Sequence, residues 1–166
     1  MENKLRLGFT GETTLIGFSD ADWGEDRHTR KSNTGFVFLF GGPISWSCRK
    51  QTCVAQSSTE AEFIALAEAS KECIWLRNIL NDFHIPLNEP TEINEDNQSC
   101  IRIVHEERFN MRTKHIDIKA HHIKDNIEKG VIKIKYCSTE QNIADLLTKP
   151  LSKSKFNNLK HQFNLI

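Results

Sequence analysis

The chain has 166 residues, of which 38% are hydrophobic and 27% are charged, with 22 Lys and Arg residues against 22 Asp and Glu residues. This length is typical of one compact domain, which removes about 70% of its unfolded surface from water and needs no disulfide or structural metal. The zero net charge excludes a uniformly basic coat for nucleic acid. No run approaches the roughly 18 apolar residues of a membrane span, and no apolar signal core follows residues 1–4, so we expect neither secretion nor membrane insertion.

The cysteines are odd in number and scattered along the chain. This pattern suits reduced thiols in an intracellular compartment better than a disulfide framework. We interpret them as small buried or incidental residues. They are Cys48, Cys53, Cys73, Cys100 and Cys137.

Three strands are predicted near the start of the chain. Residues 15–19 form a short apolar run that ends at the acidic Asp20. Residues 35–40 are aromatic and β-branched, and residues 44–48 alternate as a partner strand would, with two glycines and a proline between the runs. The two runs predict a hairpin, and we expect the first strand to pair with it.

A long helix follows the hairpin. Residues 57–59 supply N-cap side chains, and strong helix formers with acids in the first turn come after them. Apolar residues recur at helical spacing from Phe63 to Phe83, and Pro86 ends the pattern. The sequence therefore predicts a helix that begins near Ser58.

Strands and helices alternate in the rest of the chain. We expect a strand over residues 91–95, a helix over 99–105, a further helix capped by Gly130, a strand over 131–136, and helices before and after Pro150. The resulting order is three strands, helix, strand, helices, strand, helix. This order indicates an α/β or α+β fold with a mixed sheet covered by helices.

Four acids each end or begin an element beside the predicted sheet. They are Asp20, Glu62, Asp96 and Asp145. Because open α/β sheets place their sites at strand ends, we expect these side chains to converge on one edge of the sheet. Four close carboxylates repel one another and raise one another's pKa values unless divalent cations neutralise them.

The ligand type indicates the metal and the reaction. Oxygen-only ligands favour Mg²⁺ or Mn²⁺ over zinc. Two such ions about 4 Å apart can form hydroxide from water and stabilise the attacking and leaving oxygens of a phosphodiester displacement. The predicted reaction is metal-assisted hydrolysis of a nucleic acid. The alternative for any one of the acids is a helix cap or a surface charge.

Six short motifs follow one another along the chain. They are residues 17–23 (Gly-Phe-Ser-Asp-Ala-Asp-Trp), 41–46 (Gly-Gly-Pro-Ile-Ser-Trp), 57–63 (Ser-Ser-Thr-Glu-Ala-Glu-Phe), 96–98 (Asp-Asn-Gln), 112–117 (Arg-Thr-Lys-His-Ile-Asp) and 144–149 (Ala-Asp-Leu-Leu-Thr-Lys). In this order they resemble the ribonuclease H domain of Ty1/copia-type retrotransposon Pol polyproteins. The similarity spans about Leu15 to Phe163.

The resemblance implies a ribonuclease H-like fold, which is a five-stranded mixed sheet flanked by helices. It also implies an endoribonuclease that uses two Mg²⁺ or Mn²⁺ ions to hydrolyse the RNA strand of RNA–DNA hybrids during reverse transcription. The products would carry a 3′-hydroxyl and a 5′-phosphate.

The family pattern assigns the acids to positions. Asp20 matches the acid that ends the first strand, with Asp22 as its competitor, and Asp96 and Asp145 match the third and fourth acids. The helix acid of the family precedes an apolar residue and has an Ala three positions on, which favours Glu62 over Glu60.

Each acid then has an expected role in holding the ions. Asp20 and Asp96 would be shared ligands, Glu62 would hold the ion nearer the leaving oxygen, and Asp145 would hold the ion that activates water.

Selectivity for RNA requires contacts to 2′-hydroxyl groups. Ser58 and Gln98 match polar substrate-contacting positions of related domains, and helix capping is their alternative. Arg112 and Lys114 are candidates for contacts to hybrid phosphates, with a solvated charged loop as the alternative.

Other signals in the sequence are weaker. Many cellular relatives have a His before the last acid, and residues 136–141 contain none. His115 belongs to the copia-type pattern as a possible accessory residue, and a cap or packing role is its alternative. Trp23, Trp46 and Trp75 are expected in the core rather than as stacking platforms for bases.

The resemblance also implies an organisation and partners. Residues 1–14 would be the residual connection to an upstream polymerase region, residues 15–149 the ribonuclease H domain, and residues 150–166 a C-terminal helical extension. The chain is too short for a whole polyprotein, so it would be a fragment or a separately encoded remnant. We expect an RNA–DNA hybrid and the reverse transcriptase domain of the same polyprotein as partners, no membrane, and a monomer as an isolated domain. In an active element it would lie in a cytoplasmic virus-like particle.

A second hypothesis is a catalytically silent or domesticated hybrid-binding remnant of such a polyprotein. The presence of all four acids favours the enzyme. A third hypothesis, an integrase-like strand-transfer domain, needs two Asp residues with a Glu last in the series. Here Glu62 is second and Asp145 closes the series, which excludes it.

Overall fold

The computed structural model describes residues 14–106 and 114–163. Within them, five strands form one mixed sheet in the order β3-β2-β1-β4-β5. The strands are β1 (Leu15–Ala21), β2 (Asn33–Phe40), β3 (Pro43–Lys50), β4 (Thr91–Glu95) and β5 (Ile132–Tyr136). The predicted strands, and the five-stranded mixed sheet with flanking helices, are confirmed.

The pairing of β1 places two strand ends at one edge of the sheet. β1 runs antiparallel to β2, with Asp20 opposite Gly35, and parallel to β4 on its other side. Because neighbouring parallel strands end at the same edge, the residues that follow β1 and β4 come together. Asp20 near the end of β1 and Asp96 directly after β4 therefore lie at that edge.

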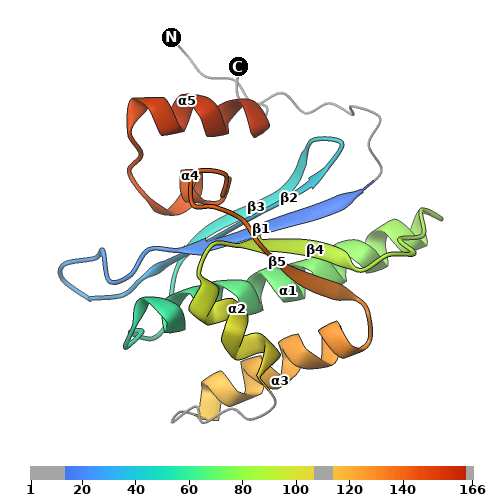
Figure 1. The fold of residues 1–166 in the computed structure, drawn as a ribbon, viewed down its shortest axis with the longest axis horizontal. Coiled ribbons are helices and arrows are strands. Elements are labelled where there is room, and N and C mark those ends of the chain that lie inside the picture. The colour runs from blue at the N-terminus through green and yellow to red at the C-terminus, as the bar shows by residue number, and fades with distance from the viewer. Residues whose placement is uncertain (1–13, 107–113, 164–166) are drawn as a thin grey trace.

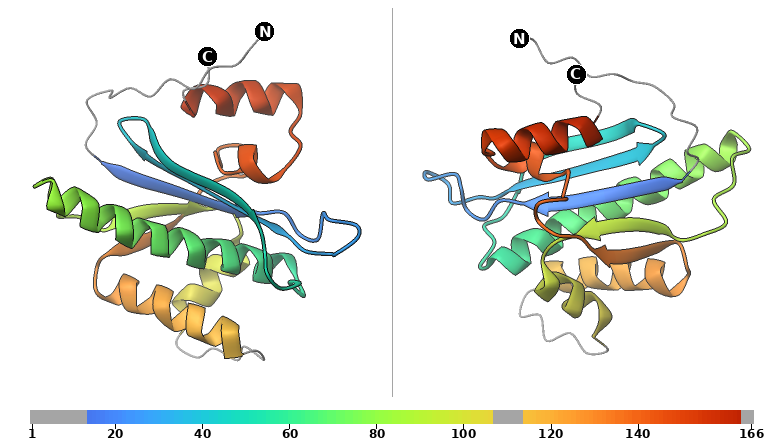
Figure 2. Two further views of the ribbon diagram at one scale, coloured as in Figure 1. Left: turned by 180° about the vertical axis from the view of Figure 1, so that it is seen from behind. Right: turned by 45° about the horizontal axis from the view of Figure 1, so that its top comes forward.

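Helices cover both faces of the sheet (Figures 1 and 2). One face carries α1, α2 and α3, and the opposite face carries α4 and α5. The helices are α1 (Ser58–Asp82), α2 (Gln98–His105), α3 (Lys114–Glu128), α4 (Asp145–Thr148) and α5 (Lys153–Gln162). Among the described residues, no helix has the length and apolar character needed to cross a membrane.

Alternation along β2 divides the core between the two faces. Phe36 and Phe38 are buried in the larger cluster, with residues of α1 such as Phe63. Val37 points the opposite way and is buried in a smaller cluster with Ile143 and Phe163. The two faces of β2 therefore pack against different parts of the chain, because successive side chains of a strand point to opposite faces of the sheet.

The prediction that the tryptophans lie in the core is wrong. Trp23, Trp46 and Trp75 are 58%, 44% and 55% exposed. Trp23 follows the end of β1, and Trp46 lies on the edge strand β3, so neither is covered on all sides. Trp75 is in α1, but the buried positions around it are Cys73 and Leu76, which places its ring on the outward side of the helix.

Candidate active site

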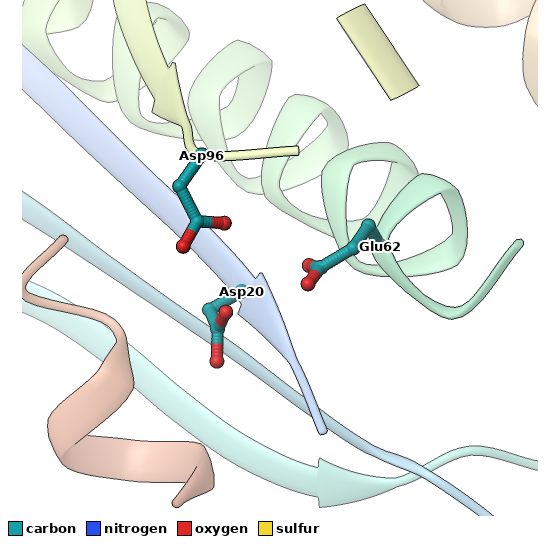
Figure 3. Close-up of side chains that lie close together, drawn as sticks. All are labelled: Asp20, Glu62 and Asp96. Atoms are coloured by element: carbon teal, nitrogen blue, oxygen red, sulfur yellow. The ribbon is translucent and has the colours of Figure 1, made fainter. Parts of the chain in front are cut away.

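Three carboxylates converge where β1 and β4 end (Figure 3). Asp20 comes from β1, Asp96 directly follows β4, and Glu62 comes from the second turn of α1. Each offers one oxygen, and these oxygens all lie within 4.8 Å of one another. Asp20 and Glu62 are buried, whereas Asp96 is partly exposed, so the cluster opens on the Asp96 side.

The local structure of α1 decides which of its two acids enters the cluster. Ser57 is the N-cap, and its hydroxyl accepts a hydrogen bond of 3.1 Å from the backbone N–H of Glu60. The Glu60 carboxylate accepts a bond of 2.8 Å from the backbone N–H of Gln56, which closes a capping interaction. Glu62 faces the sheet instead, and its Oε2 accepts a bond of 2.7 Å from the backbone N–H of Ala21.

Burial and mutual repulsion raise the pKa values of Asp20 and Glu62. Burial is the largest cause of the raised pKa of Asp20, about 6, and it outweighs the effect of the nearby Lys149 ammonium. Burial, followed by the charges of Glu95 and Asp20, raises the pKa of Glu62 to about 11. A divalent cation would remove this repulsion and favour the ionised carboxylates.

Glu95 is a further buried acid that the sequence analysis did not single out. It directly precedes Asp96 as the last residue of β4 and is fully buried. Its carboxylate accepts hydrogen bonds from the Ser19 hydroxyl at 2.8 Å and from the backbone N–H of Asn97 at 3.0 Å. Burial raises its pKa to about 8 despite these bonds.

Asp145 does not join the three-carboxylate cluster directly. It is fully buried as the first residue of α4. The Lys149 ammonium lies 2.8 Å from its Oδ1 and 2.7 Å from Oδ1 of Asp20, so a lysine links the two acids. The Lys155 ammonium contacts Oδ2 of Asp145, and the Thr148 hydroxyl donates to Oδ2 of Asp20. Burial opposes the charge of Lys149, but the two carboxylates hold its pKa above the usual range.

A glycine permits this arrangement by letting α4 approach β2 closely. A Cβ atom on Gly35 would lie 2.5 Å from Cγ2 of Thr148, closer than two carbon atoms can pack. The Asn142 amide also donates to the backbone oxygen of Ser19 at 2.8 Å, which ties the segment before α4 to β1. Thr148 and Lys149 can therefore reach Asp20. Lys149 belongs to the motif 144–149, and its spacing of four from Asp145 is the signal that could have pointed to the ion pair.

Asp22, the competitor for the first position, has a different role. It is buried, and its Oδ1 accepts a bond of 2.7 Å from the backbone N–H of Asn33. Its Oδ2 accepts a bond of 2.5 Å from the Asn33 side chain. Asp22 thus fastens the two ends of the loop between β1 and β2, and it lies outside the metal-capable cluster of the described residues.

The predicted substrate-contacting residues lie at the rim. Ser58 and Gln98 are exposed at the first positions of α1 and α2, near Glu62 and Asp96 in sequence. Capping, their alternative role, belongs instead to Ser57 and to Asn97, whose Oδ1 accepts from the backbone N–H of Cys100 at 2.9 Å.

Three further predicted residues, or their side chains, lie outside the described part of the chain. Arg112 lies outside the described residues. Lys114 and His115 begin α3, and their side chains are likewise outside what is described.

The donor set suits a hard divalent cation. Every oxygen of the cluster belongs to a carboxylate, which is the ligand type that Mg²⁺ and Mn²⁺ accept. Asp20, Glu62 and Asp96 could hold such an ion together. Among the described residues, Lys149 links Asp145 to the cluster by contacting both Asp145 and Asp20.

No protein-family model matches the chain. Over 152 residues (90% of its length) it is 41% identical to the retrovirus-related Pol polyprotein from transposon TNT 1-94 of Nicotiana tabacum. Over 92% of its length it is 36% identical to the corresponding polyprotein from transposon RE2 of Arabidopsis thaliana. Over 92% it is 32% identical to the Transposon Ty1-NL2 Gag-Pol polyprotein of Saccharomyces cerevisiae. The chain spans 11%, 11% and 9% of these relatives.

Solved structures show the same fold. LC11-RNase H1, isolated from compost by a metagenomic approach, is similar with a TM-score of 0.60 and 18% identity, over 82% of this chain and 93% of that one. Its complex with an RNA/DNA hybrid gives a TM-score of 0.59, over 81% and 94%. A foamy viral protease-reverse transcriptase in complex with an RNA/DNA hybrid gives 0.58 at 18% identity, over 89% of this chain and 21% of that one.

Proposed function

For a chain that has the ribonuclease H fold and whose homologues are Ty1/copia-type Pol polyproteins, we propose metal-dependent hydrolysis of the RNA strand of RNA–DNA hybrids. The observation that carries this proposal is the cluster of Asp20, Glu62 and Asp96, whose oxygens lie within 4.8 Å of one another at the ends of β1 and β4. The reaction would serve reverse transcription in the parent element.

The acids of the cluster would hold Mg²⁺ or Mn²⁺. Two such ions, when bound, supply an activated water and stabilise the attacking and leaving oxygens of the phosphodiester. Asp20, Glu62 and Asp96 would bind and orient the metal through carboxylate oxygens, and Asp145 would supply the fourth carboxylate once Lys149 releases its Oδ1. The partly exposed Asp96 leaves the open side on which a phosphate can approach.

Residues at the rim would select the RNA strand. Ser58 and Gln98 present exposed polar groups at the two helix starts that border the cluster. A hydroxyl and an amide can each hydrogen-bond a 2′-hydroxyl group, which DNA lacks. Arg112 and Lys114 remain our candidates for contacts to hybrid phosphates.

The reverse transcriptase domain of the same polyprotein is the proposed protein partner. The chain spans about a tenth of the relatives that it matches, so the neighbouring region of such a polyprotein would share the hybrid with it. The similarity to part of a foamy viral protease-reverse transcriptase supports this proposal.

An end-labelled RNA–DNA hybrid tests the function. The chain is incubated with Mg²⁺ or Mn²⁺ beside an Asp96→Asn variant, with single-stranded RNA and duplex DNA as substrate controls. Asp125→Asn, an exposed acid of α3, is the matched control variant. We expect cleavage of the RNA strand of the hybrid alone, loss of cleavage in Asp96→Asn and in chelator, and normal cleavage by Asp125→Asn. A folded chain that binds the hybrid in the presence of metal and leaves it intact would contradict the proposal and favour a silent hybrid-binding remnant.

A further inference from the structure

We propose that the Lys149 ammonium occupies the position of the second divalent cation, so that the chain without nucleic acid binds one such ion and takes a second only after Lys149 moves away. This inference rests on the proposed metal-dependent function and concerns how the chain's own lysine regulates it.

The position of the ammonium is the first step of the argument. Lys149 Nζ lies 2.7 Å from Oδ1 of Asp20 and 2.8 Å from Oδ1 of Asp145. These are charge-assisted hydrogen bonds to both acids at once, at usual lengths for such bonds. Asp145 is fully buried, so a cation must compensate its charge when it is ionised. Lys149 thus bridges two carboxylates as a shared metal ion would.

The occupancy of the carboxylate oxygens is the second step. Both oxygens of Asp145 contact a lysine, Oδ1 with Lys149 and Oδ2 with Lys155. Both oxygens of Asp20 are also engaged, by Lys149 and by the Thr148 hydroxyl. A divalent cation placed between Asp20 and Asp145 would face an ammonium at close range, and like charges repel strongly where water is scarce.

The other side of the cluster differs. Within the described part of the chain, neither Glu62 nor Asp96 forms an ion pair with a lysine or arginine. Oε2 of Glu62 accepts a single backbone hydrogen bond, from Ala21. An ionised carboxylate has about four lone-pair sites, so Asp20 can still share an ion with Glu62 and Asp96 while it accepts from Lys149 and Thr148. The two sides of the site therefore differ. The side with Glu62 and Asp96 can accept a cation, whereas the charge of Asp145 on the other side is already neutralised by Lys149.

The backbone near Lys149 is fixed, whereas the side chain is partly exposed to solvent. The close approach of α4 to Gly35 fixes the backbone near it. Its side chain is nevertheless 32% exposed, whereas that of Lys155 is 13% exposed. The ammonium of Lys149 can therefore swing toward solvent without unfolding α4, and its departure would free oxygens of Asp20 and Asp145 together.

Counting bound Mn²⁺ tests the inference without any cleavage. The number of ions bound by the whole chain, free of nucleic acid, is measured by electron paramagnetic resonance and titration calorimetry at neutral pH. We expect one ion for the wild-type chain and two for Lys149→Met. Two lysine controls should keep one ion: Lys153→Met, which changes an exposed residue of α5, and Lys155→Met, which leaves the Lys149 bridge intact.

The outcomes separate this inference from the proposed function. Two ions of similar affinity on the wild-type chain, or one ion on a folded Lys149→Met chain, would overturn the inference and leave hydrolysis standing. No ion on the wild-type chain would contradict the metal-dependent function itself. Lys149→Arg guards against a loss of folding in Lys149→Met, because it keeps the charge. It should bind one ion, and two ions on that variant would also overturn the role of the cation.

Discussion

The carboxylate of Glu62 accepts a hydrogen bond of 2.7 Å from the backbone N–H of Ala21. This bond joins the first helix to the last residue of the first strand, one residue beyond Asp20. Any shift of α1 along the sheet would therefore break a buried bond and separate the two acids at the same time. The fold and the geometry of the acidic cluster are held by the same contact, so the helix that covers the sheet also positions a metal ligand.

The structure separates the roles of Asp20 and Asp22, which lie two residues apart. Asp20→Asn is expected to weaken Mn²⁺ binding by more than about 100-fold, because loss of an outer partner alone typically costs 10–100-fold. Asp22→Asn should bind Mn²⁺ normally and lose about 1 kcal/mol of unfolding free energy, because a neutral amide accepts more weakly from Asn33. Calorimetric titration and urea unfolding measure the two effects. Weak metal binding by Asp22→Asn with normal binding by Asp20→Asn would reverse the assignment.

Glu95 predicts how the stability of the metal-free chain depends on pH. Burial raises its pKa in the folded chain to about 8, whereas an unfolded glutamate titrates near its ordinary value of 4.5. The stabilising contribution is therefore complete below pH 4.5 and is lost as the pH rises through 8, because the folded state holds the proton that the unfolded state releases. One such group changes the free energy of unfolding by up to about 1.4 kcal/mol per pH unit in this window.

Replacing Glu95 with glutamine tests this contribution. In chelator, urea unfolding between pH 5 and pH 8 should show a loss of stability that is less steep for Glu95→Gln than for the wild-type chain. Glu92 lies on the same strand, but its carboxylate contacts Lys133 and Lys135, which lower its pKa. Glu92→Gln should therefore leave the slope in this window unchanged. Equal slopes for the wild-type and Glu95→Gln chains would refute the proposed protonation.

Trp23 lies exposed beside the site and is expected to contact the hybrid. Its indole N–H donates to the backbone oxygen of Ala55 at 3.2 Å, which holds the ring at the rim near the start of α1. Trp23→Ala should weaken hybrid binding about fivefold, since stacking on an aromatic ring contributes about 1 kcal/mol or more. Fluorescence anisotropy in an Asp96→Asn background measures binding without cleavage. Trp75→Ala is the control, because it removes a similarly exposed ring from the outward side of α1. It should change hybrid binding less than about twofold. Equal effects of the two variants on binding would count against a contact at Trp23.

Most elements of the fold could be predicted because their signals are local. The aromatic and β-branched run of residues 35–40 predicted the strand β2, and the structure shows that Phe36 and Phe38 are buried on one face and Val37 on the other. Gly130, with a φ of 65°, ends α3 as the sequence predicts, since an αL position after a helix favours glycine. Such signals need only neighbouring residues to be interpreted.

The exposure of Trp75 could not be predicted in the same way. Its spacing of one from Leu76 and four from Ile79 indicates a position in the core. Leu76 is buried and Ile79 only partly so, and the phase of the helix places Trp75 on the opposite side. A residue near the boundary of an apolar stripe can lie on either side of it, and only the packed sheet decides which.

The acidic cluster was partly visible in the sequence, because strand ends and a helix start each carry an acid. The lysine bridge was not, because it depends on how closely α4 packs on β2. Lys149 reaches Asp20 across 129 residues of chain, and Gly35 permits the approach. Contacts of this range are set by tertiary packing and leave no periodic signal.

The most direct test of the account compares Glu62→Gln with Glu60→Gln in single-turnover cleavage of an RNA–DNA hybrid in Mg²⁺. Glu62 lies in the metal-capable cluster, and Glu60 closes the helix cap two residues earlier. Glu62→Gln should cleave at least about 100-fold more slowly, since stabilisation by the ion that it holds amounts to several kcal/mol. Glu60→Gln should stay within about twofold of the wild-type rate, because glutamine also serves at this capping position. A wild-type rate for Glu62→Gln, or a large loss for a folded Glu60→Gln chain, would contradict the assignment of the active site.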